Sequence, residues 1–143
     1  MAFETTLISK IYNFATERVV VRQLQQGLQV QLDPGDHRTV GWPVPWVNSP
    51  GDMGGSAPRL IHVGLQATDR YVLIWQHDQM IISGLSYTQF STLGPDMLVG
   101  GQKDLVIRHT HIELHTAGQA HFQVKPAAAA EQAEMFGGGQ GGF

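Results

Sequence analysis

Hydrophobic and polar residues alternate along most of this chain in short runs that turn-forming residues separate. The clearest run is residues 27–32, in which leucine and valine alternate with glutamine. A period of two is typical of a β-strand with one buried face. The next four residues, Asp-Pro-Gly-Asp at 33–36, predict a tight turn. Proline presets φ there and glycine accepts a positive φ.

The same pattern recurs along the chain and predicts an all-β fold. Residues 70–76 give the strongest strand signal, because they are mostly β-branched, aliphatic or aromatic. Further strands are expected at residues 60–65, 79–83, 86–92, 97–99, 104–115 and 119–125. Short strands at this spacing favour one antiparallel β-sandwich or jelly-roll-like domain, which we place at residues 3–126.

Residues 6–19 fit two structures. Their apolar positions lie on one face of a helix capped by Thr6, but residues 13–16 equally suit a turn between two strands. We favour strands, because three consecutive valines at 19–21 lead into a β-rich region. After the domain, residues 127–143 form an Ala/Gly-rich tail, which we expect to be disordered or to dock onto a partner.

Metal-capable side chains recur at every second position near the end of the predicted domain. They are His109, His111, Glu113 and His115. On one strand they would project from the same face, with Val106, Ile112 and Leu114 on the opposite face. Imidazole and carboxylate are ligands for zinc and other first-row divalent metals.

A metal site would need a ligand from a neighbouring strand, and His121 is the candidate. A three-residue loop at 116–118 would place His121 opposite Glu113 and add it to the ladder. A two-residue turn would place His121 opposite Leu114, on the other face. The metal hypothesis therefore depends on one residue of register. The alternatives are a polar strand face without metal and a pH-sensitive histidine surface.

A second candidate site lies in the long segment 42–58, which is rich in proline and glycine. Long loops on a rigid scaffold often carry binding residues. An indole ring can stack on a sugar, and nearby polar side chains can donate or accept hydrogen bonds. The candidate ligand-binding residues are Trp42, Trp46, Asn48, Asp52 and Gln76. The alternative is that both indole rings are buried and cap the sandwich.

Charge and composition narrow the function classes. The nine Lys and Arg residues are scattered among twelve Asp and Glu residues, so no basic cluster predicts nucleic-acid binding. The chain contains no cysteine, which excludes thiolate metal sites. No transmembrane segment and no cleavable signal peptide are evident. We expect a protein that is cytoplasmic, or released without such a signal.

Three functions stay open. The first is a non-enzymatic, lectin-like binding module that recognises a carbohydrate or another surface ligand through the tryptophan-bearing loop. The second is a self-assembling structural protein such as a shell, fibre or phage component, and exposed sheet edges favour a homo-oligomer in either case. The third is a metal-dependent enzyme centred on residues 109–115. We favour the first, because catalytic signatures such as a Gly-x-Ser-x-Gly motif are missing.

Overall fold

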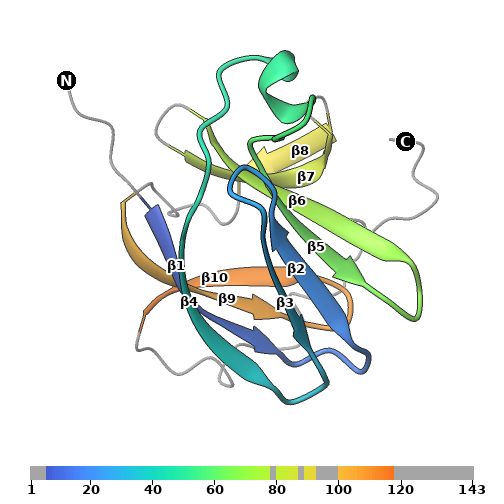
Figure 1. Ribbon diagram of the computed structural model, residues 1–143. Coiled ribbons are helices and arrows are strands. Elements are labelled where there is room, and N and C mark those ends of the chain that lie inside the picture. Colours follow the sequence, from blue (N-terminus) through green and yellow to red (C-terminus); the bar gives the residue numbers. More distant parts are fainter. Residues whose placement is uncertain (1–5, 78–79, 87–88, 93–99, 118–143) are drawn as a thin grey trace.

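Two packed β-sheets make up the computed structural model, which describes residues 6–77, 80–86, 89–92 and 100–117 (Figure 1). The smaller sheet has four strands in the order β10–β9–β1–β4. Their bounds are β1 Thr6–Asn13, β4 His37–Pro43, β9 Gly101–Ile107 and β10 Ile112–Thr116. This arrangement is an all-β sandwich, as the alternating pattern predicts.

The larger sheet has six strands in the order β3–β2–β5–β6–β7–β8, and each neighbouring pair is antiparallel. Their bounds are β2 Val19–Gln23, β3 Leu28–Leu32, β5 Ile61–Leu65, β6 Arg70–His77, β7 Met80–Ser86 and β8 Gln89–Thr92. The smaller sheet departs from the antiparallel prediction at one place, because β1 and β9 run parallel.

Residues 6–19 form strands, as predicted, and not a helix. β1 ends at Asn13, whose buried side chain organises the turn into β2. Its amide nitrogen donates to the carbonyl oxygens of Glu17 and Leu32, and its side-chain oxygen accepts from the backbone of Ala15. The predicted turn at residues 33–36 is also confirmed, with Gly35 at φ 88°.

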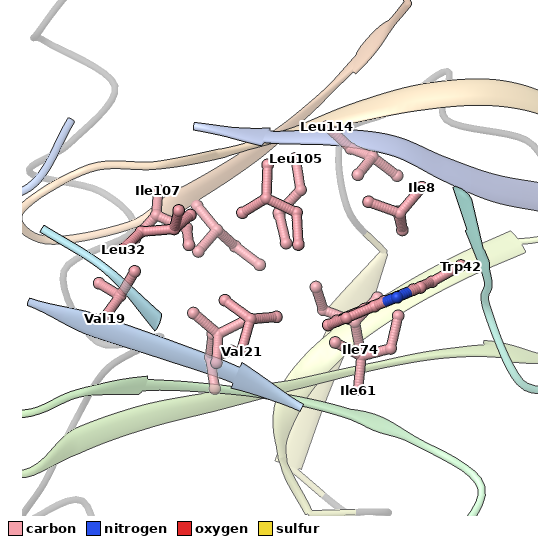
Figure 2. Close-up of a cluster of buried hydrophobic side chains, with 14 of the residues drawn as sticks. Ile8, Val19, Val21, Leu32, Trp42, Ile61, Ile74, Leu105, Ile107 and Leu114 are labelled. Atoms are coloured by element: carbon pink, nitrogen blue, oxygen red, sulfur yellow. The ribbon is translucent and has the colours of Figure 1, made fainter. Parts of the chain in front are cut away.

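The main core fills the space between the two sheets (Figure 2). Strand alternation sends every second side chain inward, so Val19 and Val21 of β2 face Ile8 and Leu105 of the smaller sheet. Trp42 belongs to this core and is 6% exposed. The predicted long loop therefore begins later than expected, because Trp42 and Pro43 belong to β4, a strand that the sequence analysis missed.

The prediction of a single strand over residues 104–115 is wrong, because this segment is a hairpin. β9 ends at Ile107 and β10 begins at Ile112, which pairs with it. The backbone nitrogen of Arg108 donates to the carbonyl oxygen of His111 at 2.8 Å and closes the turn. The reason is burial: Ile107 and Ile112 both lie in the core, although a continuous strand would point them to opposite faces.

A smaller apolar cluster lies on the outer face of the six-stranded sheet. The β4–β5 loop, residues 44–60, packs across this face and contains the short 3-10 helix Pro50–Met53. The buried members of the cluster are Val47, Leu60, Leu73, Trp75 and Ile82. The loop is therefore a structural cover for part of the sheet.

Several predicted elements lie outside the described residues, namely the strands at 97–99 and 119–125 and the tail at 127–143. Within the described part of the chain, no helix is long and apolar enough to cross a membrane.

Candidate functional site

Three members of the predicted histidine ladder meet at one carboxylate. Glu113 accepts hydrogen bonds from His111 Nε2 at 2.7 Å and from His115 Nε2 at 3.1 Å. Arg108 Nε also donates to Glu113, at 3.2 Å. The shared face predicted for residues 111, 113 and 115 is thus present. Val106 was expected on the opposite face, but it pairs with Glu113 and so lies on the same face.

This cluster is largely closed to solvent. His111 is 1% exposed, and none of the described residues offers a hydrogen-bond partner to its Nδ1 atom. Burial would raise the pKa of Glu113, but the hydrogen bonds from the two histidines and the charge of Arg108 outweigh it and lower that pKa to about 2. The Glu113 side chain is therefore a carboxylate at neutral pH, and it links the β9–β10 turn to β10.

The remaining ladder residue, His109, lies in the hairpin turn and contacts other elements. Its Nδ1 atom is 2.9 Å from the hydroxyl oxygen of Thr16, and its carbonyl oxygen accepts from Arg70. Across the described residues, no group of three or more His, Asp or Glu side chains is arranged to hold a metal ion. His121, the ligand expected from a neighbouring strand, lies outside those residues.

The five residues predicted to bind a ligand around the long loop do not converge on one point. Trp42 is in the core between the sheets, whereas Trp46 is half-buried and forms a bridge with the backbone of Gln76. Asn48 is exposed, and its backbone nitrogen donates to the carboxylate of Asp52 at 2.9 Å. That bond, together with the nearby charge of Arg59, lowers the pKa of Asp52.

Gln76 is fully buried, and its amide group is committed to the fold. Its oxygen accepts from the hydroxyl of Thr6 at 2.7 Å, and its nitrogen donates to the carbonyl oxygen of Val44 at 2.6 Å. These bonds tie the start of β1 and the start of the loop to β6. The polar groups of Gln76 and Asp52 thus hold the loop in place.

The six-stranded sheet carries a concave site beside the loop that the sequence analysis did not identify. We name it the sheet depression; its volume is about 210 Å³. Its lining comes from β2, β5, β6 and the turn between β5 and β6: Val20, Arg22, His62, Gly64, Leu65, Gln66, Asp69, Arg70 and Tyr71. Tyr71 also packs against the smaller apolar cluster that the loop covers, so this one side chain connects the depression to the loop.

Strand pairing explains why these residues meet. Arg22 of β2 lies opposite His62 of β5, and Gly64 lies between Val20 and Tyr71. Because Gly64 has no side chain, the outer face of the six-stranded sheet is hollowed at this position. A Cβ atom at this position would come within 3.1 Å of His62 Cε1. Glycine inside a strand often marks such a close approach.

Aromatic rings and a cation give the depression its chemistry. The rings of His62 and Tyr71 stack, with centroids 5.4 Å apart and planes 6° from parallel. Burial and then the positive charge of Arg22 lower the pKa of His62, so its imidazole is neutral at pH 7. A neutral imidazole offers one donor and one acceptor. The depression thus combines a flat ring wall with directional polar groups.

Comparisons with known proteins give no further guide. The chain matches no protein-family model, and neither the curated proteins nor the solved structures yield a match.

Proposed function

We propose that this chain is a non-enzymatic, lectin-like binding module whose ligand site is the sheet depression. The observation that carries the proposal is the stacked pair His62–Tyr71 beside the floor at Gly64. Ligand sites in proteins are concave, and a few well-placed polar groups in them fix the ligand's orientation. The depression has both properties and lies on a rigid sheet.

A carbohydrate suits this combination of groups. A sugar ring has apolar C–H faces and a rim of hydroxyls, so it can pack on aromatic rings while its edge makes hydrogen bonds. The neutral imidazole of His62 can accept a hydrogen bond from a hydroxyl at its unprotonated nitrogen, while its own backbone accepts from the other nitrogen. The volume of about 210 Å³ is below the roughly 300–1,000 Å³ of sites for drug-sized ligands, which favours a single sugar ring.

In this proposal the β4–β5 loop braces the site. Met53 of the loop and Tyr71 of the wall pack against the same apolar cluster, which includes Trp75. The loop therefore limits how far the Tyr71 ring can move. This role replaces the direct ligand contact that the sequence analysis expected from the loop.

Filling the floor of the depression tests the proposal. Gly64→Ala adds a methyl group that forces the His62 ring to move, so we expect the affinity for the bound sugar to fall roughly tenfold or more. A glycan array identifies the sugar, and titration calorimetry measures both affinities. The matched control is Gly51→Ala in the loop, where the added methyl group meets no atom within 4 Å.

The control should bind as tightly as the unmodified protein, and thermal unfolding should show that both variants are folded. A blank glycan array, or a Gly64→Ala protein with full affinity, contradicts the proposed function.

A further inference from the structure

Arg22 lines the sheet depression with most of its donors uncommitted. Within the described part of the chain its guanidinium makes one hydrogen bond, from Nε to the side-chain oxygen of Gln29 at 3.1 Å. The side chain is exposed and lies opposite His62 across the β2–β5 pair. The two terminal amino groups therefore form an open fork, the geometry that binds a carboxylate through two parallel hydrogen bonds.

The other arginine of the depression is already neutralised. Arg70 lies 3.4 Å from the buried carboxylate of Glu17, and it also donates to the carbonyl oxygen of His109 at 2.8 Å. Burial raises the pKa of Glu17, but the hydrogen bonds from Thr68 and Arg70 outweigh it and lower that pKa. Arg70 thus forms a structural ion pair with Glu17.

The charge of Arg22 acts on the neighbouring His62. Arg22 lowers the pKa of His62, and no carboxylate acts on His62 in the opposite direction. The acidic group of the lining, Asp69, lies past the end of β5, beyond Leu65. From His62 to Leu65 is three residues, or about 10 Å along the strand. Arg22 and Asp69 therefore lie toward opposite ends of the depression.

We propose that the ligand is an acidic sugar, a uronic acid, whose carboxylate binds the Arg22 fork while its ring hydroxyls donate to Asp69. This inference rests on the proposed function and adds the ligand class to it. The anion would neutralise the Arg22 guanidinium, which forms no ion pair with the described residues, and the ring would pack along the wall of His62 and Tyr71.

Matched acid and neutral sugars test this directly. The probes are glucuronate with glucose and galacturonate with galactose, because each pair differs only at the C6 position. In titration calorimetry we expect at least one acid to bind roughly 10–100-fold more tightly than its neutral partner, as a charge-assisted pair would give. Arg22→Gln should remove this preference by lowering the affinity for the acid to that for its neutral partner.

Arg38→Gln is the control for the loss of a positive charge, since Arg38 is exposed on β4 of the other sheet. It should keep the preference for the acid. If all four sugars fail to bind, or if the neutral sugar binds as tightly as the acid, the inference is overturned. In that case a neutral sugar found on the glycan array would leave the proposed function standing, whereas a blank array would overturn both.

The imidazole of His62 gives a second readout. The charged and titratable groups around it are Arg22 from β2, Tyr71 and Arg70 from β6, and Asp69 from the turn. A carboxylate bound at Arg22 should raise the pKa of His62, followed by NMR titration of the ring protons. The neutral sugar brings no charge and further shields the ring from water, so it should not raise that pKa. An unchanged pKa with the acid bound would show that the anion sits elsewhere.

Discussion

Trp42→Ala should lower the free energy of unfolding by about 3–5 kcal/mol, the typical cost of removing a large aromatic side chain from a core. Trp42 is 6% exposed and packs between the two sheets, where it meets Ile8, Ile61 and Ile74 (Figure 2). The rigid sheets on both sides cannot close over the space that the indole leaves. Chemical denaturation, followed by circular dichroism, measures the loss.

Leu28→Ala is the control, because Leu28 is 37% exposed at the edge of the six-stranded sheet. Substitutions at such surface positions usually change the free energy of unfolding by less than about 0.5 kcal/mol. If Trp42→Ala were as mild as Leu28→Ala, Trp42 would not be part of the core, and a role for it in ligand binding would return.

Acid should destabilise the fold through Glu113. Its pKa is 4.5 in the unfolded reference and about 2 in the folded protein, because two histidines and Arg108 stabilise the carboxylate. The stabilisation is complete above pH 4.5 and is lost as the pH falls toward 2. The shift corresponds to about 3 kcal/mol at neutral pH. Denaturation midpoints measured from pH 7 to pH 2 follow this loss.

Glu113→Gln keeps the size of the side chain and removes its charge. The variant should be less stable than the unmodified protein at pH 7, and the difference should shrink as the pH approaches 2. For comparison, Asp33→Asn breaks the exposed ion pair with Arg18 and should cost at most about 1 kcal/mol. A difference for Glu113→Gln that does not change with pH would show that the cluster has no electrostatic role.

Strand alternation made much of the fold predictable. The inward positions of β2 and β5, such as Val21 and Val63, are buried, and the positions between them face outward, as a period of two requires. The segment 70–76 carries a further signal. Its Leu73 and Trp75 are apolar like its inward residues, which indicates a strand that is covered on both faces. The β4–β5 loop supplies that second cover.

The hairpin within residues 104–115 was also marked in the sequence. Leu105 and Ile107 hold odd positions, whereas Ile112 and Leu114 hold even ones, and all four lie in the core. On one continuous strand the core-facing residues are either all odd or all even in number. The change from odd to even therefore indicates a turn near residues 108–111. The alternating pattern of residues 109, 111, 113 and 115 does not reveal this change. It correctly placed residues 111, 113 and 115 on one face but wrongly added His109.

The sheet depression could not be predicted from the sequence, because it depends on strand order. Arg22, His62 and Tyr71 come from three strands, and the chain does not show that β2 lies beside β5 and β5 beside β6. The local signal was Gly64 in the interior of a mostly β-branched and apolar strand, two residues after His62. That signal marks a close approach without showing what approaches.

The most direct test of the binding site is an NMR titration of the ¹⁵N-labelled protein with the sugar that binds most tightly. The competing location is the β4–β5 loop around Trp46 and Asn48. We predict saturable shifts of backbone amide signals centred on Val20, Gly64 and Gln66, the floor and rim of the depression. Shifts centred on residues 46–52 instead, with Gly64 unmoved, would contradict our account.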